Sequence, residues 1–175
     1  MLKFLRGGRR RSESVVKLDL WALRSNRMPP EAKILGIGGI IPLLAGVVMV
    51  LAVREPFGVP VLRITLAYAA FILAFLGGIH WGFASAALAG SALELDAPRI
   101  LGLSVLPALA SCISVLLPGA FAALFLAVAF TSVLLLDRVC ERLGYTPFWW
   151  LTLRVWLTTA VVPLLLLLGI AALTR

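Results

Sequence analysis

The chain has 175 residues and a net charge of +8, with 62% apolar and only 14% charged residues. Soluble domains are typically about 45–50% apolar and about 25% charged, so this composition excludes an ordinary water-soluble domain and predicts apolar side chains that face lipid. Two cysteines and one histidine also exclude a disulfide-rich secreted scaffold and a histidine metal cluster within one chain.

The N-terminal segment, residues 1–33, holds nine Lys or Arg side chains against three acidic ones. Basic residues beside long uncharged stretches are typical of membrane topology, which argues against a nucleic-acid surface. Val16, Leu20 and Leu23 recur at helical spacing, so the segment forms either a short interfacial helix or a mobile cytoplasmic or matrix tail. It lacks a compact apolar core with a cleavage site, so we expect no signal peptide, although its arginine-rich start also fits a mitochondrial presequence.

Five apolar stretches follow the basic tail. A helix needs about 20 apolar residues to cross the ~30 Å hydrocarbon core of a bilayer. The stretches end at charges or at proline, as at residues 54–56. We therefore predict one all-α domain over residues 34–173, a polytopic bundle of five transmembrane helices. The predicted spans are residues 34–53, 64–90, 100–117, 120–136 and 155–173.

The third and fourth spans come from one uncharged stretch of 37 residues between Arg99 and Asp137. This stretch is too long for one ordinary crossing, and Pro118-Gly119 near its middle is a turn signal. A tight helical hairpin is the first interpretation. A re-entrant loop that enters and leaves on one side is the alternative, because both halves are short for a crossing.

The basic residues of the loops predict the orientation. With the N-terminus inside, the inner segments (residues 1–33, 91–99 and 137–154) carry thirteen Lys or Arg residues and the outer segments carry three. Basic residues are enriched on the cytoplasmic side, so we predict the N-terminus inside and the C-terminus outside. We expect the protein in the inner membrane of a bacterium or, in a eukaryote, of a mitochondrion.

The second span contains the one histidine of the chain, His80. Its helix face also carries Leu73, Leu76, Gly77 and Ala84, so we expect the imidazole to be buried in protein. An ionisable group at that depth indicates either a packing hydrogen bond or a proton-handling or substrate-contacting role, since imidazole changes charge near neutral pH. Haem ligation would need a second axial ligand from another chain.

Another face of the second span carries a stripe of small residues. Small side chains at every fourth position let the backbone of a neighbouring helix approach closely. With a close neighbour on this face and others around His80, we expect the second span at the centre of the bundle. The stripe consists of Gly78, Gly82, Ala86 and Gly90.

A polar stripe in the third span is the expected partner of His80. Its residues recur in steps of three and four and therefore share one helix face. A proline in the stripe removes a helical hydrogen bond, and a hydroxyl or a water satisfies the freed carbonyl. The stripe consists of Ser104, Pro107, Ser111 and Ser114.

Charged residues mark the inner ends of the fourth and fifth spans. Asp137 and Arg138 follow the fourth span, and Arg154 precedes the fifth. We expect Asp137 and Arg154 either to pair and clamp the two helix ends or to extend independently to solvent. Tryptophans at this end predict an aromatic belt at the membrane interface; they are Trp149, Trp150 and Trp156.

Motifs for catalysis are absent from the sequence. It has no phosphate-binding glycine loop with its lysine, no paired intramembrane carboxylates, no nucleophile elbow and no metal-ligand spacing. We therefore expect no enzyme activity, no cofactor and no metal site.

Three short motifs resemble one known family. They are residues 75–82 (FLGGIHWG), 101–107 (LGLSVLP) and 134–138 (LLLDR). Over residues 30–173 the chain is similar to the family catalogued as domain of unknown function 3429, the transmembrane protein 69-like integral membrane proteins. The resemblance implies a small five-helix inner-membrane protein with no established activity, and it draws attention to His80, Trp81 and Asp137.

The sequence predicts an accessory or assembly subunit that packs against a larger membrane complex, because its short loops leave no room for a soluble catalytic domain. The expected partners are membrane lipids and another integral membrane protein, and not nucleic acid. The alternative function is a small transporter or proton-coupled carrier that uses His80.

Overall fold

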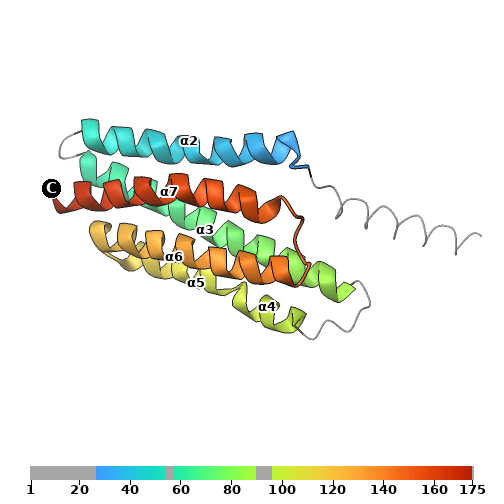
Figure 1. The fold of residues 1–175 in the computed structure, drawn as a ribbon. Coiled ribbons are helices and arrows are strands. Elements are labelled where there is room, and N and C mark those ends of the chain that lie inside the picture. Colours follow the sequence, from blue (N-terminus) through green and yellow to red (C-terminus); the bar gives the residue numbers. More distant parts are fainter. Residues whose placement is uncertain (1–26, 54–56, 90–95, 175) are drawn as a thin grey trace, which may run out of the picture.

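The computed structural model describes residues 27–53, 57–89 and 96–174. Within these ranges the chain forms helices joined by short turns, without a strand (Figure 1). The predicted interfacial helix of the basic tail and the small residue Gly90 lie outside the described residues. The helices are α2 (Pro30–Ala52), α3 (Gly58–Ala89), α4 (Ala97–Leu103), α5 (Leu106–Leu116), α6 (Gly119–Arg142) and α7 (Trp150–Leu173).

In the described part of the chain, five helices are long and apolar enough to cross a membrane, with α4 and α5 together forming one of them. The prediction of an all-α membrane bundle with five transmembrane helices is therefore confirmed. Both arms of the hairpin at Pro118 reach crossing length, which favours a hairpin over a re-entrant loop. The inside location of the N-terminus stays a prediction.

Helix α3 is the central element of the bundle. It packs against α2, α4, α5 and α6, while α7 packs mainly against α6 and α2. Figure 1 shows α2 and α3 close together at one end of the bundle and diverging toward the other, with α7 between them. The buried core is aliphatic and aromatic, and its fully buried members include Leu43, Leu73, Leu126, Phe130 and Leu165.

The helices extend beyond the predicted uncharged spans. α3 begins at Gly58 and α6 continues to Arg142, because a helix ends where its backbone is capped and not where the hydrocarbon ends. The cap of α6 is a Schellman motif. Gly144 adopts a left-handed φ of 74°, its N–H donates to the carbonyl of Glu141 at 3.0 Å, and the N–H of Tyr145 donates to that of Cys140 at 2.9 Å.

The third span is broken between α4 and α5, at Ser104 and Val105. Pro107 is the second residue of α5, where proline costs no hydrogen bond. The break lies directly against α3: a methyl group added at Gly77 would lie 2.6 Å from the backbone oxygen of Ser104. Glycine at position 77 therefore permits a close approach between α3 and this broken span.

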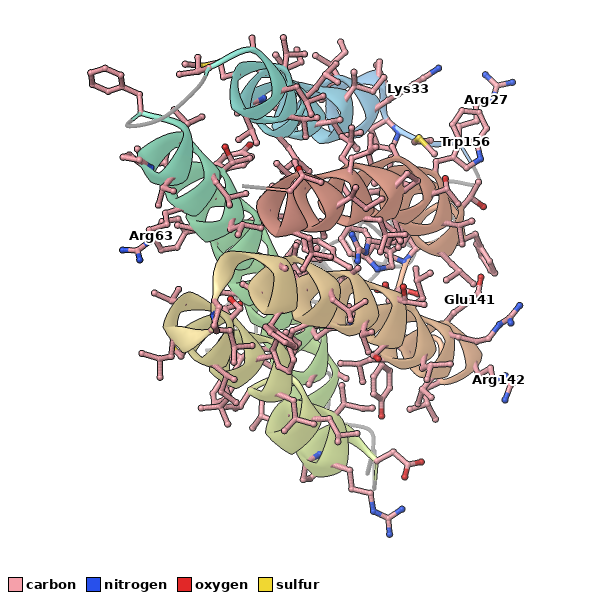
Figure 2. All side chains as sticks on the ribbon, turned by 90° about the vertical axis from the view of Figure 1, so that its left-hand side faces the viewer. Arg27, Lys33, Arg63, Glu141, Arg142 and Trp156 are labelled. Atoms are coloured by element: carbon pink, nitrogen blue, oxygen red, sulfur yellow. The ribbon has the colours of Figure 1, made fainter. Side chains whose placement is uncertain are left out.

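The outer surface of the bundle is apolar. Phe71 and Leu135 are more than two-thirds exposed, and so large an apolar surface is typical of a lipid-facing protein. Charged side chains such as Arg63, Glu141 and Arg142 lie at the periphery and point away from the bundle (Figure 2).

We predict that Gly77→Ala lowers the free energy of unfolding by about 1–3 kcal/mol, because the added methyl group must displace backbone. Gly78→Ala is the matched control, since a methyl group there meets nothing within 4 Å, and it should leave stability unchanged or slightly raised. Equilibrium unfolding in a denaturing-detergent titration measures both. Equal stability of the two variants would contradict the close approach at Gly77.

Candidate functional site

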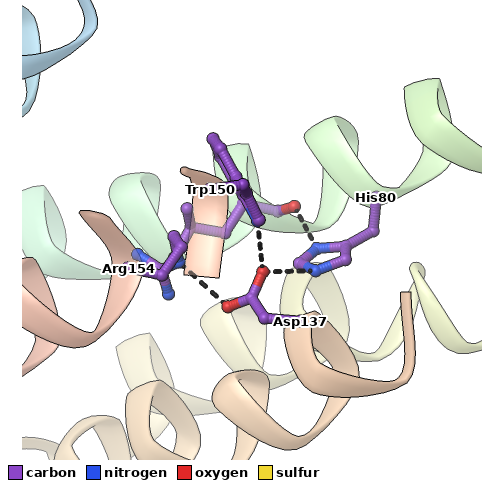
Figure 3. Close-up of polar contacts among 5 residues, drawn as sticks. His80, Asp137, Trp150 and Arg154 are labelled. Atoms are coloured by element: carbon purple, nitrogen blue, oxygen red, sulfur yellow. Dashed lines mark hydrogen bonds and ion pairs between the residues drawn. The ribbon is translucent and has the colours of Figure 1, made fainter. Parts of the chain in front are cut away.

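A buried carboxylate joins three helices near one end of the bundle. Asp137 of α6 is fully buried, and its Oδ1 lies 2.9 Å from Nε2 of His80 on α3. The indole Nε1–H of Trp150 on α7 donates to the same oxygen at 2.6 Å. Nε–H of Arg154, also on α7, donates to Oδ2 at 3.1 Å. Figure 3 shows the side chains of His80, Trp150 and Arg154 converging on this carboxylate; we call these three and Asp137 the Asp137 network.

Local sequence places the α7 donors. Trp150 and Arg154 are four residues apart and therefore share one face of the helix. The Schellman turn after Arg142 ends α6 and reverses the chain, and α7 begins at Trp150. The first turn and a half of α7 thus returns alongside the last turns of α6, where Asp137 lies.

The imidazole of His80 is fully buried and uses both ring nitrogens. Nδ1 lies 2.7 Å from the backbone oxygen of Leu76, one turn earlier in α3. That carbonyl can only accept, so Nδ1 carries a hydrogen. The bond between Nε2 and Asp137 needs a second hydrogen, which resides on Nε2 or on the carboxyl oxygen.

The Asp137 network therefore carries one positive charge when all its hydrogen bonds are formed. Arg154 contributes +1. His80 and Asp137 sum to zero, either as imidazolium and carboxylate or as neutral imidazole and carboxylic acid. The charge does not depend on which of the two atoms holds the shared hydrogen.

Aromatic rings cover the network. The ring of Phe83 lies edge-on to Trp150, with 5.3 Å between the ring centroids, and 6.3 Å from the centroid of His80. Cys140, on α6 one turn after Asp137, is also fully buried. These neighbours keep water away, which strengthens each hydrogen bond and raises the cost of losing one.

Three buried polar atoms in the described residues have no hydrogen-bond partner: Nη2 of Arg154, Oγ1 of Thr158 and Oγ1 of Thr146. Thr158 follows Arg154 by one turn on the same face of α7. Arg154 is 3% exposed and Thr158 is 4% exposed. Both oxygens of Asp137 are thus bonded, and the unused donors Nη2 of Arg154 and Oγ1 of Thr158 lie on α7.

The sequence-predicted site residues divide into two groups. His80, Asp137 and Arg154 come together, and the Asp137–Arg154 pair is one of the two arrangements expected. Among the described residues no hydrogen bond joins the serine stripe to His80, because each hydroxyl donates to a carbonyl of its own helical segment: Ser104 to Leu101, Ser111 to Pro107 and Ser114 to Ser111.

Two further predicted residues lie outside the network, and one of its members, Trp150, is not among the predicted site residues. Trp81 is half-exposed, and no hydrogen bond links Arg138 to the network among the described contacts. The sequence predicts Trp150 in the aromatic belt, but its indole is buried and bonded to Asp137. Its spacing of four residues from Arg154 was a usable signal, and the same spacing marks Thr158.

The small stripe of α3 faces outward. Gly78, Gly82 and Ala86 are exposed, and a methyl group added at either glycine would meet nothing within 4 Å. No described element of this chain packs closely against the stripe. Its predicted role in helix packing therefore stays a prediction that concerns another chain.

Fold and site together define a multi-pass helical membrane protein with a buried ionic network and, among the described residues, no group of three His, Cys, Asp or Glu side chains that could hold a metal ion. The model of the family "Protein of unknown function (DUF3429)" matches residues 28–171, and the chain belongs to this family. No curated protein and no solved structure matches the chain.

We predict that Asp137→Asn lowers the free energy of unfolding by about 3–5 kcal/mol, because the amide NH2 group would face a buried donor, either Nε–H of Arg154 or Nε1–H of Trp150, and that donor would lose its bond to the acidic side chain. Asp96→Asn is the matched control. Asp96 pairs with Arg99 at 3.1 Å, but both side chains are substantially exposed, so its loss should cost less than about 1 kcal/mol. Unfolding in denaturing detergent measures both variants, and a small effect at Asp137 would show that the network does not hold the helices together.

Proposed function

We propose that the protein is an accessory subunit of a larger membrane complex in the inner membrane of a bacterium or a mitochondrion, and that it contacts its partner through the outer face of α3. The observation that carries the proposal is the exposed stripe of Gly78, Gly82 and Ala86.

Small residues suit this face to a protein neighbour. In lipid, helices associate through van der Waals packing and not through the hydrophobic effect, so close backbone approach is the main source of affinity. The stripe is flanked by exposed aromatic side chains, Phe75 at 67% and Trp81 at 49%. A partner helix lying in the stripe would contact both rings along its sides.

The Asp137 network supports this role by fixing the helix that carries the stripe. His80 is on the buried face of α3, and its bond to Asp137 ties α3 to α6. Through Arg154 and Trp150 the same carboxylate ties α6 to α7. The outer face of α3 is thereby presented on a rigid bundle, which lowers the entropic cost of binding a partner.

We predict that Gly82→Leu abolishes association with larger species while the protein stays folded. Gly102→Leu on α4 is the matched control, because it adds the same side chain at another glycine where a methyl group meets nothing within 4 Å. Native gel electrophoresis of mild-detergent membrane extracts should show the parent and the control migrating with larger species and Gly82→Leu migrating alone. A monomeric parent under several gentle conditions, or unaffected migration of Gly82→Leu, would refute the proposal.

The burial of His80 argues against the alternative function, a proton-coupled carrier. A proton carrier must exchange its proton with water on both sides, whereas the ring of His80 is fully buried and bonded at both nitrogens. We therefore expect proteoliposomes of the parent and of His80→Gln to show the same proton flux as protein-free liposomes. A flux in the parent that His80→Gln removes would favour the carrier.

A further inference from the structure

A cavity of about 330 Å³ lies between α2, α3 and α7, where α2 and α3 diverge (Figure 1). Leu35 of α2 and Phe75 of α3 line it and are both more than two-thirds exposed, so the cavity opens sideways toward lipid. Arg154 and Thr158 line its inner wall. It also reaches Val161, seven residues beyond Arg154, which is about 10 Å along α7.

The polar part of the wall is built from the two unused groups of α7. Nη2 of Arg154 and Oγ1 of Thr158 have no partner, although both side chains are more than nine-tenths buried. Buried donors without partners are rare in folded proteins. Each of the two atoms has less than 1 Å² of exposed surface, so binding requires the two side chains to rotate toward the ligand, as interface side chains commonly do when a partner binds.

The positive charge of the Asp137 network favours a ligand with one negative charge. The Asp137 network carries one positive charge, and a single negative charge beside Arg154 neutralises it. Two of the charged groups farther along α6, Glu141 and Arg142, point away from the bundle (Figure 2). A carboxylate has two acceptor oxygens and can take one hydrogen bond from each of these two donors, and arginine binds carboxylates through charge-assisted hydrogen bonds.

We propose that this cavity binds a free fatty acid, with its carboxylate on Arg154 and Thr158 and its chain between α2 and α3. The volume is at the lower end of the range of small-molecule sites, about 300–1,000 Å³, which suits one hydrocarbon chain and not the two chains of a phospholipid. The remaining wall is apolar and includes Ile72 and Phe130. The sideways opening gives a fatty acid direct entry from the bilayer.

The test uses the full-length protein in detergent and a fatty acid with bromine atoms at mid-chain. Bromine quenches tryptophan fluorescence on contact, and Trp149 and Trp150 line the cavity. The parent should show saturable quenching by this acid. The methyl ester of the same acid enters detergent equally well but has no negative charge, and it should give only the unsaturable background.

Filling the cavity tests its location. Gly39 lines the cavity and a methyl group there meets nothing within 4 Å, so the side chain of Gly39→Leu would occupy the chain-binding space. Gly38→Leu is the matched control, because Gly38 also has open space around it but faces outward. Gly39→Leu should abolish the saturable quenching, and Gly38→Leu should keep it.

Removing one hydroxyl tests the headgroup contact. Thr158→Val keeps the side-chain shape and should weaken binding about tenfold, the loss expected for a hydrogen bond to a charged group. Thr159→Val is its control, since Thr159 is exposed and donates to the backbone oxygen of Trp156, and it should bind as the parent does.

Four outcomes would overturn the proposal: no saturable quenching in the parent, equal binding of acid and methyl ester, equal loss in both glycine variants, or unchanged affinity in Thr158→Val. Saturable quenching by a brominated two-chain phospholipid at equal affinity would assign the cavity to phospholipid instead. Thermal unfolding of each variant shows that a loss of binding is not a loss of fold.

Discussion

A carboxylate within a membrane bundle must find its hydrogen-bond donors inside the protein, because lipid chains supply none. Asp137 finds them on two other helices: His80 comes from α3, and Trp150 and Arg154 come from α7. This one requirement sets the mutual register of three helices. A shift of α7 by one residue would turn Arg154 by about 100° away from the carboxylate and leave two opposite charges buried apart.

The helices could be predicted from sequence because their length follows from bilayer thickness and their ends from charges and turns. The Asp137–Arg154 pair could be expected because both residues lie at the joined ends of consecutive spans. The partner of His80 could not, because the register between α3 and α6 depends on packing and not on local periodicity. The serine stripe was a reasonable partner by pattern, but a serine in a helix satisfies itself on the carbonyl three or four residues before it.

The glycine positions likewise show that sequence spacing does not predict contacts that depend on tertiary packing. Sequence spacing emphasises Gly78 and Gly82, which repeat every fourth residue, whereas the tight contact between α3 and the broken third span is at Gly77. The contact depends on where the α4–α5 break exposes the carbonyl of Ser104, and that break is a tertiary feature. The stripe of Gly78, Gly82 and Ala86 remains exposed. Its regular spacing therefore describes a surface of the protein and does not identify a contact inside the bundle.

Arg154 connects the polar interior to the lipid-facing cavity. Its Nε is engaged by Asp137, and its Nη2 is not bonded within the protein. α2 has no side chain in the Asp137 network; its described polar tie to α3 is the bond from the hydroxyl of Tyr68 to the backbone oxygen of Gly39 at 2.8 Å. A ligand held by Arg154 in the cavity between α2, α3 and α7 would therefore add a polar contact beside a helix that takes no part in the network, and it would stabilise the folded state more strongly the further its concentration exceeds its Kd. The Asp137 network, which fixes α3, α6 and α7, would then also help to position α2 through Arg154.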